Sequence, residues 1–455
     1  MDDVRGPVLP PALSTPVGGP GGRRLRVVER GPLARLAPVV LLLALPLSVA
    51  ALRQAGCLAH GWGAGVPVWR QCSAPVVQAV GPDGPGDGLS AWLGGGLRPV
   101  QPVLSGAVTS LLSRVAPGVA TGHQQWFLAL WVLLTAAVLA GLVVAVGTVR
   151  RHPDADPVAL ALSPVLALTV FRSTDVLPLA LAVVALWAWS RDRERLAGVL
   201  GGLAVLAGPL SAAVVLAMLL LPGGGRGGDV DGQLRRRLLV TTALTVAAVA
   251  VPVAAVDAGV LSAPWRAWVR AGAGPGSPWY LFTLAGFPVS ARHIGAIAAL
   301  GILLTLVLMV LLARIRPRPV VAAAALVGLC VALSTAASFQ PWAALWLVPF
   351  VALVGIGWRD HLLWAGAEAV HAVAMFGYLN HLLDPAHGLP PGWYAAALLL
   401  RLAAVGWLAR QAWVRASWGD AAPAGTLWRL PSARPVENST GDVGSNAYPP
   451  VTERP

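Results

Sequence analysis

Lysine is absent from this chain, and charged residues of every kind make up only 12% of its 455 residues. Hydrophobic residues make up 56%, which is more apolar surface than a single soluble core can bury. The net charge of +13 comes from arginines that lie in short clusters between apolar runs, not on the basic face of a soluble domain. These features exclude a soluble enzyme and a nucleic-acid-binding protein, and they indicate a protein whose solvent is the bilayer.

Long apolar runs recur along almost the whole chain. A helix needs about 20 apolar residues to cross the roughly 30 Å hydrocarbon layer. We therefore predict an all-α polytopic membrane protein, a bundle of roughly 10–12 transmembrane helices. Full spans are expected at residues 35–53, 126–148, 157–171, 175–190, 238–257, 293–313, 319–336, 341–357, 361–382 and 393–414.

The arginine clusters set the orientation, because cytoplasmic loops carry the excess of positive charge. Both termini are predicted to be cytoplasmic, with long external loops at 54–125 and 258–292. One conflict arises at residues 195–221, where basic residues flank a single apolar run on both sides. The Gly208-Pro209 pair at its centre removes the conflict, since proline and glycine break a helix. We predict a hairpin of two half-helices that returns to the cytoplasmic side.

The chain is expected to consist of one membrane domain and two tails. Residues 1–30 and 417–455 are rich in Pro, Gly and Ser and are predicted to be disordered and cytoplasmic. Residues 31–416 form the transmembrane domain, and no cleavable signal peptide is evident before its first span. Exclusive use of arginine as the basic residue, with abundant Ala, Gly, Pro and Val, suggests a GC-rich bacterial genome and hence the bacterial plasma membrane.

Cys57 and Cys72 both fall in the first external loop, which is an oxidising location. A disulfide between them is expected, with two free thiols as the alternative. Within the spans, ionisable residues are costly and therefore notable. Glu368 and His371 share one face of a helix, and Arg401 on the last span lies at a similar depth. A structural ion pair that joins the two helices is the expected role.

Tryptophan is unusually abundant, with nineteen residues. Most are expected to be interfacial anchors, although sugar enzymes also stack pyranose rings on aromatic faces. The external set suggests substrate contacts. Cations alternate with the indoles of Trp265 and Trp268, and this segment could hold a lipid-linked phosphate between Arg266 and Arg270. The remaining candidates for substrate binding are Arg172, Gln340, Trp342 and Trp346.

Four stretches resemble one family, the polyprenol-phosphate-sugar-dependent glycosyltransferases of the GT-C fold, and in particular glycosyltransferase family 87, the alpha-mannosyltransferase-like group. Residues Gln340–Pro349, QPWAALWLVP, resemble its "sPwYllWllP" signature. The stretch from Asp175 to Pro209 is similar to its "D…l…G…Gla…K..P" hairpin. Residues Trp364–His371 resemble its "WxxaE" span, and Gln101–Gly106, QPVLSG, its "EYPVLTG" motif. Together these stretches cover residues 35–415.

The resemblance implies a GT-C-like membrane enzyme. Its expected reaction moves a sugar, mannose by the family's example, from a polyprenyl phosphate to a glycolipid or glycan hydroxyl on the external face. Membrane lipid, the lipid-linked sugar and the acceptor are the expected partners, without nucleic acid. The donor itself is the only small molecule implied, with no dissociable cofactor and no metal.

An inverting transfer needs a carboxylate to accept the proton of the acceptor hydroxyl. In relatives an acid follows a cysteine close to the position of Cys72, where this chain has Ser73-Ala74-Pro75, and the "EYP" glutamate is replaced by Gln101. Three carboxylates remain as candidates for the base. They are Asp83, Asp87 and Asp175, the last with Arg172 beside it.

The lost acids leave two other function classes open. A catalytically silent relative could serve as a subunit in envelope glycolipid assembly. A transporter of lipids or small molecules is the third possibility, and it is disfavoured because the chain shows no internal repeat and few charges at mid-membrane depth.

Overall fold

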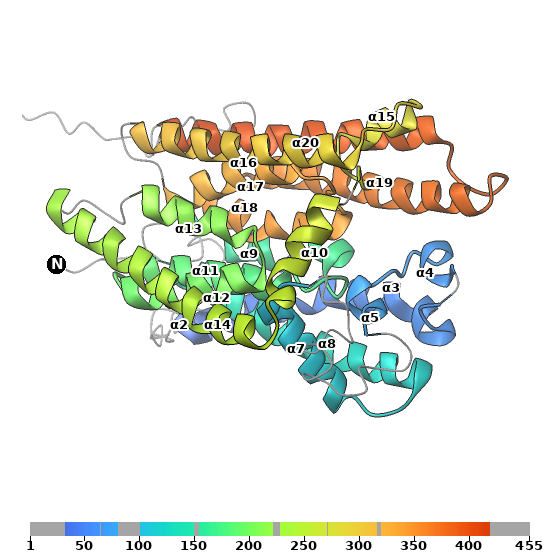
Figure 1. The fold of residues 1–455 in the computed structure, drawn as a ribbon, viewed down its shortest axis with the longest axis horizontal. Helices are drawn as coiled ribbons and strands as arrows, with labels where there is room; N and C mark the ends of the chain where they lie inside the picture. Colours follow the sequence, from blue (N-terminus) through green and yellow to red (C-terminus); the bar gives the residue numbers. More distant parts are fainter. Residues whose placement is uncertain are drawn as a thin grey trace, which may run out of the picture.

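The computed structural model of the chain describes residues 32–63, 65–80, 101–149, 154–221, 228–270, 272–315 and 320–418. Every regular element in these ranges is helical, which confirms the all-α prediction (Figure 1). Asp83, Asp87 and the two predicted tails lie outside the described residues, except for residues 417–418. Six of the described helices are long and apolar enough to cross a membrane: Ala34–His60, Ala120–Thr148, Gly232–Pro264, Ala291–Arg314, Trp358–Leu383 and Pro391–Ser417.

Two predicted full spans are broken helices. Their pieces are α9 (Pro157–Ala161) and α10 (Pro164–Thr169) in one case, and the 3-10 helix η2 (Pro341–Trp346) and α18 (Val348–Val354) in the other. Each piece has proline in its first two positions. Proline lacks an N–H and suits the first turn, so each one starts a new helix. The prediction of continuous spans was wrong here, because hydropathy measures burial and not continuity.

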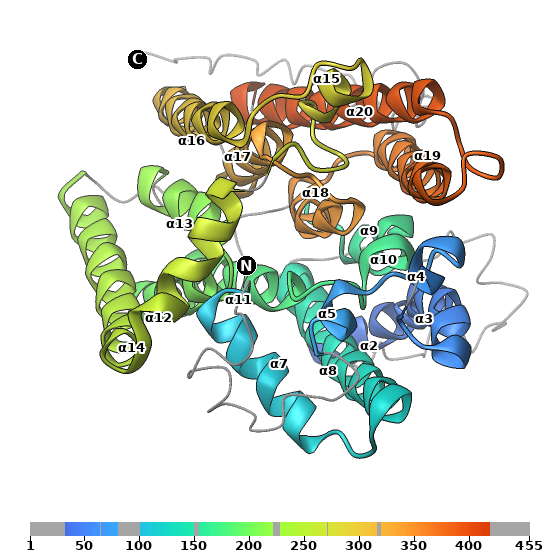
Figure 2. The ribbon, with the colours of Figure 1, turned by 45° about the vertical axis from the view of Figure 1, so that its right-hand side comes forward.

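The N-terminal helices form one side of the molecule. α2 (Pro32–Leu42) and α3 (Ala44–His60) make one span with a kink, since Pro46 cannot donate to the carbonyl of Leu42. α2 packs on α8 (Ala120–Thr148), which also packs on α11 (Val176–Ser190), while α3 packs on α10. The short helices α4 (Val66–Trp69) and α5 (Pro75–Gln78) follow α3. Figure 2 shows this group opposite α16, α19 and α20.

The C-terminal helices pack around α17 (Val321–Thr335), in which the side chains from Ala322 to Leu326 are fully buried. Its neighbours are α16 (Ala291–Arg314), α18 and α20 (Pro391–Trp418), and α20 pairs with α19 (Trp358–Leu383). The short α15 (Tyr280–Leu284) contacts α20. A helix with fully buried alanines brings its neighbours close, and this centre organises the second half of the fold.

The predicted hairpin is present. α12 (Glu194–Ala207) ends where Gly208 adopts an extended conformation, and α13 (Ser211–Leu220) begins after Pro209. The two helices fold back on each other and are in close contact. A Cβ added at Gly201 on α12 would lie 3.1 Å from the Cγ2 of Val215 on α13. The carbonyl of Ala204 accepts both the N–H of Gly208 and the hydroxyl of Ser211, each at 2.9 Å, which joins the start of α13 to the end of α12.

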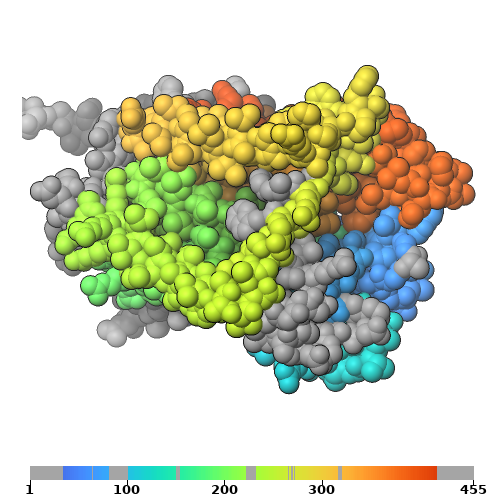
Figure 3. Space-filling model, viewed as in Figure 1, coloured from blue at the N-terminus to red at the C-terminus, as the bar shows by residue number. Residues whose placement is uncertain are grey.

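α14 (Gly228–Arg270) lies parallel to α12, which shows that the hairpin returns to the end from which it started. Arg237 pairs with Glu194 at 2.8 Å, and Thr242 donates to the carbonyl of Gly198 at 3.2 Å. α14 is two helices in one, because Asp257 has non-helical dihedral angles and its carboxylate accepts the N–H of Gly259 at 2.7 Å. No residue in the most apolar window of α14 is buried inside the protein, and Figure 3 shows α14 along one face of the molecule.

The contact between α12 and α14 depends on small residues. A Cβ at Gly202 would lie 2.8 Å from the Cβ of Thr245 and 2.9 Å from the carbonyl oxygen of Thr242. We expect Gly202→Val to lower the free energy of unfolding by about 1–3 kcal/mol, because the helices must separate. Thermal unfolding in detergent measures the effect. Gly141→Val, at a helix position with no neighbour within 4 Å of the added Cβ, is the control and should change little.

α7 (Val103–Val115) has polar and apolar residues at helical spacing. Its polar face is buried, including Ser105, Thr109 and Ser113, while Leu111 and Val115 are 62% and 63% exposed. The hydroxyls of these three polar residues find partners in the protein, while Val108 and Leu112 pack against the core. α7 therefore packs through its polar side and presents an apolar side, as a helix in contact with lipid does.

Candidate active site

Asp175 lies in the turn between α10 and α11, partly buried, at the meeting point of several distant segments. Its carboxylate accepts the hydroxyl of Ser173 at 2.7 Å and the indole N–H of Trp346 at 3.1 Å. Trp346 is the last residue of η2 and is 1% exposed. Burial raises the pKa of Asp175, and the two hydrogen bonds offset part of that rise because they favour the charged form. The carboxylate is thus held in one orientation.

The tip of the α12–α13 hairpin packs against this turn. A Cβ at Gly208 would lie 2.8 Å from the Cγ of Pro178 and 3.7 Å from the Cζ2 of Trp346. The Ser105 hydroxyl on α7 donates to the carbonyl of Ala207 at 2.7 Å. The hairpin tip, the first turn of α11, η2 and α7 therefore meet around the Asp175–Trp346 contact. Glycine at 208 permits this close approach.

The first loop reaches the same place through Arg172, whose side chain is 3% exposed. Its guanidinium donates to the carbonyls of Gln71 at 2.8 Å and Ser73 at 2.9 Å, and it lies over the ring of Phe376. Burial, with the nearby charge of Arg53, lowers the pKa of Arg172. Within the described part of the chain, neither arginine has a carboxylate partner. Arg172 therefore positions the segment of the first loop around Cys72.

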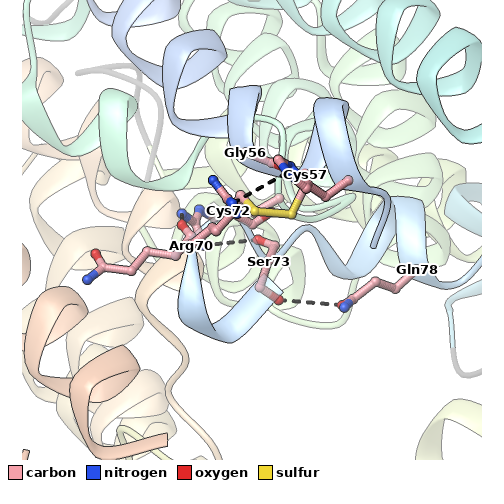
Figure 4. The surroundings of a disulfide bond; sticks show 9 residues. Gly56, Cys57, Arg70, Cys72, Ser73 and Gln78 are labelled. Atoms are coloured by element: carbon pink, nitrogen blue, oxygen red, sulfur yellow. Dashed lines mark hydrogen bonds between the residues drawn. A yellow bond between two sulfur atoms is a disulfide. The ribbon is translucent and has the colours of Figure 1, made fainter. Parts of the chain in front are cut away.

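The Cys57–Cys72 disulfide is present, with a Cα–Cα distance of 5.8 Å and both residues fully buried (Figure 4). It joins the last turn of α3 to the segment that Arg172 holds. After the bridge, Ser73 donates to the side-chain oxygen of Gln78 at 3.4 Å. The bridge and Arg172 thus fix the same short segment, because the two carbonyls that Arg172 binds flank Cys72.

Peptide mapping without reductant is expected to recover Cys57 and Cys72 in one linked species. Reduction should lower the thermal midpoint, since a bridge that closes a loop of about 15 residues contributes about 3 kcal/mol in the chain-entropy model. Cys330→Ala is the control, because that buried thiol is free and its loss should leave the linked species intact. Recovery of both loop cysteines as alkylated thiols would contradict the bridge.

The predicted ion pair is also present and is fully buried. The Nε of Arg401 lies 2.8 Å from the Oε2 of Glu368, whose other oxygen accepts the indole N–H of Trp364 at 3.1 Å. Arg401 also donates to the backbone carbonyls of Phe339 and Gln340. His371 lies near this pair, 5.8 Å from the ring centre of Tyr394, but neither ring nitrogen has a hydrogen-bond partner among the described residues. The pair joins α19 to α20 and extends to the segment before η2.

A cluster of tyrosines was missed in the sequence. Tyr378 and Tyr394 stack at 4.9 Å, and the ring of Tyr280 meets both at their edges, at 6.1 and 6.0 Å. Trp342 packs against this cluster. The signal was available, because the chain has only four tyrosines and these three all lie near predicted external ends of spans. Tyr378 and Tyr394 are buried, while Tyr280 and Trp342 are partly exposed at the edge of the cluster.

The other predicted binding residues stay predictions. Arg266 and Arg270 are exposed near the end of α14, and Arg266 donates to the carbonyl of Gly259 in its own helix at 3.4 Å. The side chains of Trp265 and Trp268, like Asp83 and Asp87, lie outside the described part of the structure. Among the described residues, no group of three or more His, Cys, Asp or Glu is placed to hold a metal ion.

Helices that cross a membrane and a carboxylate held at their meeting point are features of a helical membrane enzyme. The model of glycosyltransferase family 87 matches residues 102–334, which are 233 of the 455 residues. The chain belongs to glycosyltransferase family 87, a family of GT-C-type membrane enzymes. The match includes Asp175 and the hairpin but ends before η2. No curated protein matches the chain.

Proposed function

We propose that this multi-pass membrane glycosyltransferase moves a sugar, mannose in the first instance, from a polyprenyl-phosphate donor to a hydroxyl of a cell-envelope glycolipid or glycan. The reaction takes place on the external face of the bacterial plasma membrane, with both termini in the cytoplasm. One observation carries the proposal: the carboxylate of Asp175 is held by Ser173 and Trp346 where the family-like segments meet. Membrane lipid, donor and acceptor are its partners, and no dissociable cofactor is needed.

The proposed chemistry is a single displacement with inversion. The acceptor oxygen forms a bond to C1 of the sugar while the bond from C1 to the phosphate oxygen breaks. The acceptor proton passes to Asp175, and the bonding electrons leave with the polyprenyl phosphate. Cationic groups favour that leaving group because its negative charge grows in the transition state. The candidates for these groups are Arg172, whose guanidinium lies near Arg53, and Arg266 and Arg270, which are predicted to bind the phosphate.

The sugar needs a surface of its own. Trp342 and Tyr280 are the partly exposed rings here, and aromatic faces suit the apolar face of a pyranose ring. η2 carries both Trp342 and Trp346, so it links this place to Asp175. We propose that donor or acceptor sugar stacks here, with the side chain of Gln340 at the edge as a hydrogen-bonding group.

The test is sugar transfer by the full-length protein in lipid nanodiscs. Radiolabelled polyprenyl-phosphate mannose and polyprenyl-phosphate glucose are offered with glycolipids extracted from the native envelope. Label should move to the glycolipid fraction from one donor, and free polyprenyl phosphate should accumulate in equal amount. Transfer from the glucose donor alone would support the proposed reaction but would show that the sugar is glucose and not mannose.

A silent subunit is the second candidate, and one observation favours it. In the described part of the first loop, Ser73 and Gln78 hydrogen-bond to each other after Cys72, where relatives carry an acid. Absence of transfer from every polyprenyl-phosphate donor, together with altered envelope glycolipids in a deletion strain, would establish this function in place of the first.

A further inference from the structure

The position of η2 depends on contacts with the rest of the protein. It is a 3-10 helix of six residues, and such helices have poor hydrogen-bond geometry and are short. Its last residue, Trp346, donates to Asp175, and its start follows the extended segment at Phe339 and Gln340. The end of η2 is fixed by the burial of Trp346 and by the start of α18 at Val348, so the segment at Phe339 and Gln340 fixes the other end.

Arg401 on α20 fixes it. The guanidinium is fully buried, donates to the carbonyls of Phe339 and Gln340, and lies 3.6 Å over the ring of Phe339. Glu368 holds the Nε of Arg401, and Trp364 in turn holds the second oxygen of Glu368. All the donors that Arg401 directs at the segment are thus aimed by a chain of buried side chains on two long helices.

A second contact reaches the same segment. Gly276 has a φ of +84°, and a Cβ there would collide with the carbonyl of Phe339 and lie 2.8 Å from the Nη1 of Arg401. Its N–H donates to the hydroxyl of Tyr394 at 2.9 Å, and the N–H of Gly274 donates to the carbonyl of Ala337 at 2.9 Å. Both the 274–277 turn and Arg401 therefore hold the segment before η2.

We propose that Arg401 is a positioning residue for sugar transfer, which sets η2 so that Trp346 meets Asp175. Glu368 and Trp364 aim Arg401, and the pair thus has a role beyond joining α19 to α20. The inference rests on the proposed function, in which Asp175 is the base. It goes beyond that function because it assigns a role to Arg401, a residue that touches neither donor nor acceptor.

The experiment compares two arginines on the same helix in full-length protein in nanodiscs. Arg401→Lys keeps the charge opposite Glu368 but loses the planar fork that reaches two carbonyls. Arg415→Lys is the control, since Arg415 donates to the carbonyl of Val354, at the far end of α18. Hydrogen exchange of the peptide covering residues 339–347 and the kcat of sugar transfer are measured for both.

We expect Arg401→Lys to speed exchange in residues 339–347 and to lower kcat by about 10-fold to 10²-fold, as a small misplacement of a reacting group can do. KM for the donor should change little, and Arg415→Lys should match the parent in both measurements. Trp346→Phe should lower kcat similarly, and Trp346→Phe combined with Arg401→Lys should be no worse than the worse single variant, because both act through one contact.

Each failure has its own signature. Unchanged exchange at 339–347, or faster exchange with unchanged kcat, would overturn the positioning role while Asp175 kept its own. The positioning role would also be overturned if the loss of kcat in the combined variant equalled the product of the losses in the two single variants. If Arg401→Lys does not fold, Glu368→Gln replaces it, and unchanged exchange in the folded variant overturns the proposal. If the parent protein transfers no sugar, the proposed function is wrong. Hydrogen exchange at residues 339–347 in Arg401→Lys then tests whether Arg401 holds η2.

Discussion

Asp175→Asn is expected to lower the rate of sugar transfer by about 10²–10⁴-fold, the usual contribution of a general base. The fold should survive, because the asparagine oxygen can still accept from Trp346 and its NH2 can donate to the hydroxyl of Ser173. Transfer of label from donor to glycolipid measures the rate. Asp384→Asn is the matched control, since Asp384 is an exposed aspartate that holds the N–H of Ala386.

The first loop offers the competing assignment. If Asp83→Asn or Asp87→Asn abolishes transfer while Asp175→Asn does not, the base lies in that loop and Asp175 is structural. Normal expression of all three variants is required for the comparison. Parent-like transfer by all three would show that none of these aspartates is the base.

The pH dependence of kcat/KM gives a second view of the same carboxylate. A base works only when deprotonated, so transfer falls as the pH drops through its pKa. Burial raises the pKa of Asp175, and the acid limb should therefore lie above the value of about 3.9 for an exposed aspartate. Trp346→Phe removes a hydrogen bond that favours the charged form, which should move the limb to still higher pH. A limb that stays in place would contradict the assignment.

Glu368→Leu is expected to lower the free energy of unfolding by about 3–5 kcal/mol, because it leaves the buried charge of Arg401 without its partner. The double variant Glu368→Leu/Arg401→Leu should recover part of this loss, since no buried charge remains. Reversible unfolding in mixed micelles measures both. Transfer should still fall in the double variant, because the carbonyls of Phe339 and Gln340 lose their donors.

The matched control is the Arg237–Glu194 pair, which has the same 2.8 Å distance but a side chain of Arg237 that is 43% exposed. Glu194→Leu should cost at most about 1 kcal/mol, since exposed pairs are weak. Equal costs at the two sites would show that burial does not determine the contribution of the Glu368–Arg401 pair.

Local features of the sequence were sufficient for several results. Composition indicated a helical membrane protein, the Gly208-Pro209 pair between basic ends predicted a hairpin, and the shared external loop of Cys57 and Cys72 favoured a bridge. The pairing of Glu368 with Arg401 followed from the cost of charges in a span. Each of these depends on the chemistry of a residue and its neighbours along the chain, which a sequence displays directly.

The tertiary structure alone decided how these pieces make a site. Asp175 and Trp346 are 171 residues apart, and the sequence around either residue does not predict their hydrogen bond. The tyrosine cluster and the reach of Arg401 to Phe339 likewise depend on how helices pack. Hydropathy and spacing in the sequence predict which residues are buried in the protein or the membrane. Which of them then touch depends on shape and close approach across the whole bundle.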